Sequence, residues 1–386
     1  MRTLLILSLA TIGLAQPDRV FAGENNAEVA RLVGNLKKGD GKAAVALVKY
    51  GAAAVPGLIE LLNGNNAILQ GHAAHALGQI GPPAKAAVPA LVGAFKNDDR
   101  TVASNASLAL GRIGPAAVPA LVEAIKTKDE NLRGYGISSL KQIGPPAKDA
   151  VPALIDLLKT GASLPDLLRY LTIETLGQIG PAAEKAVPVL LTEFGEKKSP
   201  GNPIHVYVAV ALGRIGPGAK AAVPALMEAA RAKESEAGPL KYHAVEALGR
   251  IGSSAGAAVP LLLEEARDVG SPVRLLALEA VARIGGADKV QPVLTAALRD
   301  QDATVRLYAA RALGQADPKN QAAFDVLVKG LRSTDAGQRR LAADGLGAIR
   351  PNDRAALDAL NAAQQDSDAN VRRAATQALE RIKRGK

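Results

Sequence analysis

At 386 residues the chain is longer than one ordinary compact domain, yet its composition shows no linker that would divide it. Aromatic residues make up only 3% of it and Cys is absent, which predicts a core of small aliphatic side chains and excludes disulfides, thiolate metal sites and cysteine nucleophiles. The net charge of +10 suits a protein that binds acidic surfaces or one that is simply soluble, so charge alone does not select a partner.

The first segment predicts a secretory signal peptide over residues 1–22. An early basic residue is followed by an apolar run over 4–15, which is shorter than the about 20 residues that a membrane-spanning helix needs. Val20 and Ala22 stand at the small-residue positions before a cleavage site in front of Gly23. The alternative is that this segment forms a buried first helix. The signal peptide predicts an exported protein, periplasmic or extracellular, with no membrane span in the mature chain.

The rest of the chain, residues 23–386, repeats one phrase. ALGQIGPPAKAAVPAL at 76–91 returns as ALGRIGPGAKAAVPAL at 211–226, and the apolar residue that follows its first alanine recurs every 30 to 36 residues. A period of this size indicates a solenoid, a propeller or an array. We call this recurring residue the marker; its positions are Leu47, Leu77, Leu110, Leu140, Leu176, Leu212, Leu248, Val281, Leu313, Leu346 and Leu379.

Each repeat predicts a helical hairpin. In DATVRLYAARALGQA at 302–316 the small and apolar residues recur with a helical period, and Asp302 is placed to cap the N-terminus of this helix, which we call the marker helix. Similar caps are expected at Asn66, Asp99, Asp129, Asp335 and Asp368. A glycine four residues after the marker, usually followed by proline, is expected to end the helix at Gly81, Gly114, Gly144, Gly180, Gly216 and Gly252.

The segment that follows the glycine predicts the other helix of the hairpin, which we call the proline helix. In PPAKAAVPALVGAF at 82–95, Val88, Leu91 and Phe95 lie on one helical face. Its recurring proline either stands in the first turn of the helix or bends a longer helix. This proline is found at Pro56, Pro89, Pro119, Pro152, Pro188, Pro224 and Pro260.

A second glycine recurs directly after the marker, inside the marker helix. In that place glycine costs about 1 kcal/mol relative to alanine. We therefore expect it to allow close contact between neighbouring marker helices. The positions are Gly78, Gly111, Gly177, Gly213, Gly249, Gly314 and Gly347.

A typical repeat contains AVPAL, then a turn with aspartate, and then a helix with Val-Arg that ends in ALGxIG. Together these features resemble HEAT repeats of the phycobilisome-lyase-like subclass. The resemblance covers the chain after the signal peptide and implies an all-α fold, a right-handed α-solenoid of about eleven HEAT-like hairpins. The final repeats, GLGAIRPND and ALERIKRGK, lack the Gly-Pro joint, as expected where a solenoid end faces water. Three longer repeats insert KTGASLPD, EKKSPGNP and AKESEAGP, which we expect to form loops on one edge.

Seven residues before the marker, the marker helices carry a mostly basic ladder. The resemblance implies that such an arginine pairs with the turn aspartate of its own or the next repeat, so Arg306 is expected to pair with Asp302 or Asp335. An exposed pair of this kind contributes about 0–1 kcal/mol. The ladder consists of Gln70, Ala103, Arg133, Arg169, His205, Lys241, Arg274, Arg306, Arg339 and Arg372.

A second row of the marker helices is the candidate binding surface. Positions five and two residues before the marker and two residues after it share one helical face, and in HEAT-like stacks these helices usually line the concave surface. Tyrosine and arginine are frequent anchors in protein interfaces. The other interpretation is that the tyrosine rings fill gaps between alanine-rich helices. The candidates are Tyr135, Gln142, Tyr207, Arg214, His243, Arg250, Arg283, Tyr308, Arg311 and Gln315.

No catalytic residue, metal site or cofactor is predicted. His72 and His75 lie three apart on one helix, but no further residue stands at ligand spacing. The resemblance extends to deoxyhypusine hydroxylases, which hold iron with His-Glu dipeptides, whereas each of the four histidines here precedes alanine or valine. Other relatives attach bilins to phycobiliproteins, which an exported chain would not meet.

The sequence thus predicts an exported, monomeric, non-enzymatic scaffold that binds another protein or a peptide through the concave face of its marker helices. An alternative is a binder of acidic polymers, polysaccharide or nucleic acid, through its basic surface. Nucleic acid is not expected, because Glu246, Glu279 and Asp344 interrupt the basic row. A further alternative is a lyase-like or hydroxylase-like role inherited from the repeat family.

Overall fold

The computed structural model describes residues 17–196, 203–232, 238–285, 287–349 and 353–384, and these contain helices and turns but no β-strand. Their contacts divide the chain into two units, Met1–Ala153 and Leu154–Lys386, which are treated separately below. Most of the predicted signal peptide lies outside the described residues. The first helix, α1, begins at Pro17 and runs through Gly23, and cleavage in front of Gly23 stays a prediction.

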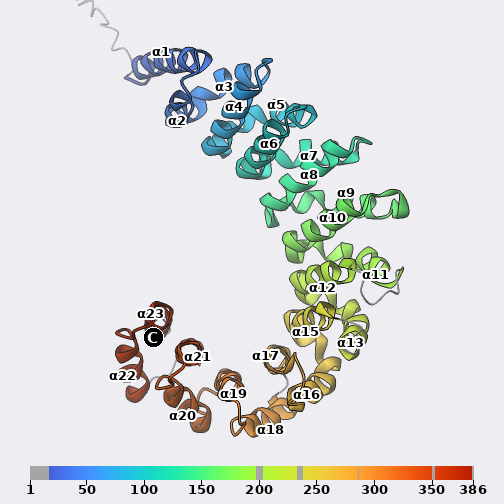
Figure 1. Cartoon of the computed structure of the whole chain (residues 1–386), viewed down its shortest axis with the longest axis vertical. Coiled ribbons are helices and arrows are strands. Elements are labelled where there is room, and N and C mark those ends of the chain that lie inside the picture. Colours follow the sequence, from blue (N-terminus) through green and yellow to red (C-terminus); the bar gives the residue numbers. More distant parts are fainter. Residues whose placement is uncertain (1–16, 197–202, 233–237, 286, 350–352, 385–386) are drawn as a thin grey trace, which may run out of the picture. The chain divides into compact units, whose positions relative to one another are not determined.

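Unit 1 consists of helices that pair in chain order (Figure 1). They are α1 (Pro17–Lys37), α2 (Lys42–Val48), α3 (Val55–Leu62), α4 (Ala67–Ile80), α5 (Val88–Gly93), α6 (Arg100–Ile113), α7 (Val118–Lys126) and α8 (Glu130–Ile143). The boundary between the units falls within α9 (Val151–Leu158).

Unit 2 continues the same pattern of paired helices. It contains α10 (Asp166–Ile179), α11 (Val187–Glu196), α12 (Pro203–Ile215), α13 (Val223–Arg231), α15 (Pro239–Ile251), α16 (Val259–Arg267), α17 (Arg274–Ile284), α18 (Ala287–Ala297), α19 (Ala303–Ala316), α20 (Gln321–Gly330), α21 (Ala336–Ile349), α22 (Arg354–Ala363) and α23 (Ala369–Arg384). The described helices thus form about eleven pairs, and the predicted all-α solenoid of HEAT-like hairpins is confirmed.

The predicted helix boundaries are confirmed at both ends of the marker helices. Asp302 accepts a hydrogen bond from the backbone N–H of Thr304 at 2.7 Å, and the other predicted caps accept similar bonds. Gly216 ends α12 with φ of 74°, a left-handed conformation that glycine adopts without strain. All six predicted terminal glycines have positive φ. Most of these joints continue as a short 3₁₀ turn before the next proline helix.

The recurring proline stands in the first turn of its helix and does not bend a longer one. Pro224, for example, is the second residue of α13, where the missing N–H has no helical partner to lose. A short 3₁₀ turn, Gly216–Ala222, precedes it and carries the change of direction between the marker helix α12 and the proline helix α13. This outcome decides between the two arrangements that the sequence left open.

The core of each unit consists of small side chains between packed helices. The marker residues are buried in every repeat, as are most alanines on either side of them. Neighbouring marker helices come together at the glycine after the marker, as predicted. A Cβ atom on Gly78 would lie 2.9 Å from Cα of Ala109 in the next marker helix. The same contact joins Gly177 to Ala211, Gly213 to Ala247, Gly249 to Ala280 and Gly347 to Ala378.

The ladder residue Arg306 binds other atoms than the sequence predicted. Its Nη1 donates to the backbone carbonyl oxygens of Asp300 and Gln301 at 2.6 and 2.9 Å. The predicted pairing with Asp302 or Asp335 is therefore wrong. Both of those carboxylates instead accept backbone N–H bonds at the start of their own helices.

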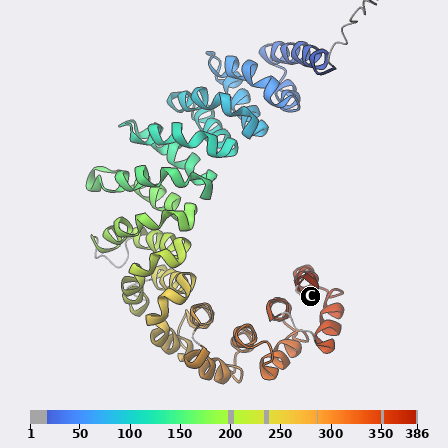
Figure 2. The same cartoon turned by 180° about the vertical axis from the view of Figure 1, so that it is seen from behind.

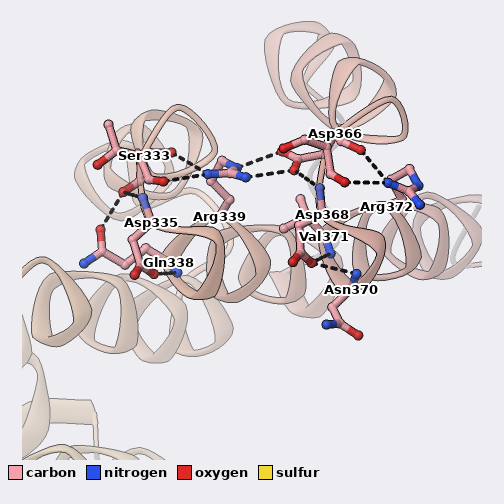
Figure 3. A network of polar contacts seen from close by, with 11 residues as sticks. Ser333, Asp335, Gln338, Arg339, Asp366, Asp368, Asn370, Val371 and Arg372 are labelled. Atoms are coloured by element: carbon pink, nitrogen blue, oxygen red, sulfur yellow. Dashed lines mark hydrogen bonds and ion pairs between the residues drawn. The ribbon is translucent and has the colours of Figure 1, made fainter.

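The acidic partners of the ladder arginines Arg274 and Arg339 belong to the following hairpin and precede its N-cap by two residues. Arg339 donates from Nε and Nη2 to the carboxylate of Asp366 at 2.7 and 2.8 Å (Figure 3). Its Nη1 donates to the carbonyl oxygens of Ser333 and Thr334 in its own turn, both at 3.0 Å. Arg339 therefore ties two successive turns together. Other ladder contacts between hairpins are Gln70 with Asn97, Arg169 with Glu193, Lys241 with Glu265 and Arg274 with Asp300.

The first of the three predicted edge loops forms a short 3₁₀ turn, Gly161–Ser163. In the other two loops, residues 197–202 and 233–237 lie outside the described parts of the chain.

Two stretches, Arg100–Lys126 and Pro203–Arg231, are apolar and long enough to cross a membrane by length and composition. Each is made of two helices that meet at a glycine with positive φ, and no single one of these helices reaches the about 20 residues of a span. The absence of a membrane span stays a prediction.

Candidate binding groove

The marker helices of unit 2 lie on the inner side of its curve, and the proline helices lie on the outer side. Figure 1 shows α12, α15, α17, α19 and α21 facing inward, and Figure 2 shows the same arrangement from behind. Residues two positions after the marker occupy the last turn of these helices. Most of them are exposed because the preceding and following residues are used for helix packing.

An open groove crosses the C-terminal ends of four successive marker helices, α10, α12, α15 and α17. Its charged lining consists of Arg214, Arg250 and Arg283, three of the predicted site residues, and it includes no acidic side chain. Gln178 and the glycines and prolines of the joints complete it. We call this surface the arginine groove.

Each arginine of the groove is held by a neighbour on its own or the adjacent helix. Arg250 pairs with Glu246 and Arg283 pairs with Glu279, both at 2.7 Å and both one helical turn back. Arg214 donates to the amide oxygen of Gln178 at 3.2 Å. A cation in the last turn also interacts favourably with the negative end of the helix dipole, typically by about 0.3–1 kcal/mol. The side chains of Arg250 and Arg283 remain 44% and 45% exposed.

A smaller depression adjoins the groove at Arg283. Tyr308, Arg311 and Gln315 line it, together with Glu279. The side chain of Arg311 is half-buried, and within the described parts of the chain it has no carboxylate partner. The structure therefore brings six of the ten predicted residues onto one continuous inner surface of unit 2.

The remaining predicted residues are held elsewhere. Tyr207 stacks on Tyr170 of the preceding marker helix, with ring centroids 5.1 Å apart. His243 lies near the carboxylate of Glu246, with Nδ1 and Oε2 3.4 Å apart. Neither lines the groove, although both lie on marker helices that contribute to it.

Tyr135 and Gln142 belong to unit 1. Tyr135 is half-buried and stacks on Phe95 with ring centroids 5.5 Å apart, as a residue that fills a gap between helices does. Gln142 is exposed, and its side chain covers Gly111 of the preceding marker helix. Sequence reasoning missed Gln178, which stands two residues after the marker Leu176 and so carries the same positional signal as the arginines.

The groove offers fixed positive charge and hydrogen-bond donors, which suit an anionic ligand. His75 contacts Gln79 on its own helix, with Nε2 3.4 Å from the amide nitrogen. In the part of the chain that the structure describes, no group of three His, Asp or Glu residues is placed to hold a metal ion. The absence of a metal site stays a prediction.

Comparison with known proteins identifies the repeats. HEAT repeats are matched at residues 55–134, 224–313, 259–347 and 290–380, which together span more than half of the chain. No match to the sequence is found among curated proteins.

Solved structures with a similar fold include importin beta, which is 14% identical with a TM-score of 0.54; the match covers 94% of this chain and 58% of importin beta. Kap95p, solved bound to RanGDP, is 16% identical with a TM-score of 0.49, covering 92% of this chain and 57% of its own. Human deoxyhypusine hydroxylase is 22% identical with a TM-score of 0.30, covering 78% of this chain and 97% of the enzyme. At these identities the likeness to importin beta shows the fold alone.

Proposed function

Because the chain belongs to the HEAT-repeat family, we propose that it is a non-enzymatic scaffold that binds another protein or a peptide through the inner face of its marker helices. The observation that carries the proposal is the arginine groove, an open surface across four successive helices whose lining has three arginines and no acidic residue. An open surface of this kind accepts an extended partner and has no enclosed chamber for a reaction.

Export of the scaffold is part of the proposal, and it rests on the signal-peptide pattern of residues 1–22. The partner would then be a protein of the cell envelope or the medium. Binding of a broad acidic polymer is the competing function that the net charge of +10 favours. Against it, Glu246 and Glu279 stand one turn behind the groove arginines, so the basic surface is narrow.

The experiment is site-specific photocrosslinking in the native cells. A photoreactive amino acid is placed at Gln178 in the groove and, as the control, at Glu228, which is exposed on the proline helix α13. A discrete protein adduct from position 178 that position 228 does not give supports the proposal.

Charge reversal at Arg214, Arg250 and Arg283 together should abolish that adduct. Adducts that are identical at both positions, or that survive the charge reversal, would remove the groove as the binding surface. Fractionation of the same cells tests export, which predicts that the chain is found outside the cytoplasm.

A further inference from the structure

We propose that the occupant of the arginine groove is an extended acidic segment of the partner, with a carboxylate at about every third residue. This inference rests on the proposed function and narrows it to a ligand class. It is carried by the spacing of the arginines, by the charges on either side of them and by the shape of the groove floor.

The arginines form a single row with one member on each of three successive marker helices, two residues after the marker. Arg214 lies on α12, Arg250 on α15 and Arg283 on α17. Adjacent packed helices are separated by about 8–10 Å between their axes, with small residues at the contact giving the shorter distances. The marker helices meet at such contacts, because Cβ of a residue at Gly213 would lie 2.9 Å from Cα of Ala247. The row therefore presents one cation about every 8–10 Å.

This spacing selects among peptide conformations. A polyproline II segment advances about 3.1 Å per residue with three residues per turn, so every third side chain lies on one face about 9 Å from the next. A β-strand places its same-face side chains about 6.6 Å apart, which is too short for the row. An α-helix is about 10–12 Å wide, so it would also cover the carboxylates of Glu246 and Glu279, one turn of about 5.4 Å behind the arginines.

The charges around the row favour a narrow acidic ligand. Within the described residues, Arg214 has no carboxylate partner, so it can bind a carboxylate of the ligand. Arg250 and Arg283 are already oriented by Glu246 and Glu279, and part of each arginine side chain stays exposed in the groove lining. A nucleic-acid strand carries its phosphates more densely and over a wider front, where these glutamates would repel it.

The floor of the groove allows close approach of a peptide backbone. Between the arginines the lining is made of the Gly-Pro joints, including Gly180, Pro181, Gly216 and Pro217, and Gly252. The glycines carry no side chain that would hold a ligand away from the row. A single extended chain can therefore lie along the joints with every third side chain directed at an arginine.

The test measures binding of two labelled peptides to the full chain by fluorescence anisotropy. In the first peptide, three glutamates are separated by pairs of prolines. The second has the same composition with its three glutamates in one block. We expect the spaced peptide to bind at least about tenfold more tightly. The variant Arg214→Gln/Arg250→Gln/Arg283→Gln should lose about tenfold or more in affinity for it, because it removes the three cations of the row.

The matched control is Lys185→Gln/Lys220→Gln/Arg231→Gln, which changes the net charge equally at exposed positions outside the groove and should leave the affinity unchanged. Circular dichroism confirms that both triple variants are folded. Equal binding of the two peptides, or equal losses in both triple variants, would overturn the proposal in favour of unspecific attraction. A single-stranded oligonucleotide that binds more tightly than the spaced peptide, with the same dependence on the groove arginines, would replace the peptide as ligand. A groove that crosslinks a partner in cells but does not prefer the spaced peptide refutes this inference alone.

Discussion

Replacing Asp366 with asparagine should destabilise the C-terminal hairpins through loss of one ion pair. In the folded protein Arg339 donates two hydrogen bonds to this carboxylate, and these bonds lower the pKa of Asp366 from 3.8 to about 2 (Figure 3). A pKa lowered by this amount corresponds to about 2 kcal/mol in favour of the charged carboxylate. Because the side chain of Asp366 is 12% exposed, solvent reduces this figure, and we expect Asp366→Asn to lower the free energy of unfolding by about 1–2 kcal/mol.

The pH dependence of this effect has a definite sign. The pKa of Asp366 is lower in the folded than in the unfolded chain, so its contribution is present above the unfolded value near 3.8 and is lost as the pH falls toward 2. Urea unfolding followed by circular dichroism should show a constant difference between wild type and Asp366→Asn from pH 8 to about pH 5. The difference should shrink at lower pH.

A double-mutant cycle isolates the pair itself. Arg339→Met, Asp366→Asn and the double variant should give a coupling energy of about 1–2 kcal/mol at pH 7. The control is Asp358→Asn, which removes the more exposed pair of Arg354 with Asp358, whose charged atoms are 3.8 Å apart. That change should cost less than about 0.5 kcal/mol. A coupling energy near zero for Arg339 and Asp366, or a difference that persists unchanged to pH 2.5, would refute the reasoning.

Two further predictions concern the contacts between hairpins. Ser333 occupies the position in its turn that Asp366 occupies in the next turn, and Arg306 lacks the acidic partner that Arg339 has. Ser333→Asp should therefore supply that partner and raise the free energy of unfolding by up to about 1 kcal/mol. No gain in the urea midpoint would contradict this prediction. Gly78→Ala should destabilise by about 1–2 kcal/mol, because the new Cβ would lie 2.9 Å from the next marker helix and this strain exceeds the gain of about 1 kcal/mol in helix propensity. The control Gly93→Ala meets no atom within 4 Å and should be neutral or stabilising, so equal effects of the two alanines in the same urea assay would show that helix contact is not the cause.

Local features of this fold were predictable because they depend on residues close in sequence. Asp302 caps a helix through the N–H two residues later, and Gly216 ends one by adopting a positive φ. The proline position was predictable only as two alternatives, and the helix starting at Val223 decided for the first turn. The close contact at Gly78 was also predictable, because a glycine repeated inside a helix implies a neighbour that needs the space.

The candidate site was predictable in part. The spacing from the marker placed Arg214, Arg250 and Arg283 on equivalent helix positions, and a regular stack of helices turns equivalent positions into one surface. The same spacing also selected Tyr135, which the structure shows stacked on Phe95 and half-buried. Position along a helix does not reveal how deeply a ring is covered by the preceding repeat.

The sequence by itself determined the helical hairpin, its caps and joints and the repetition of the hairpin along the chain, since all of these follow from helix geometry and from the period of the pattern. Only the tertiary structure decided which groups meet across neighbouring hairpins. Arg306 binds the carbonyl oxygens of its own turn, and Arg339 binds Asp366, a residue that the ladder pattern did not single out. Such partners depend on the offset between successive hairpins. This offset sets the distances between side chains of different repeats, which cannot be derived from the residue spacing within one repeat.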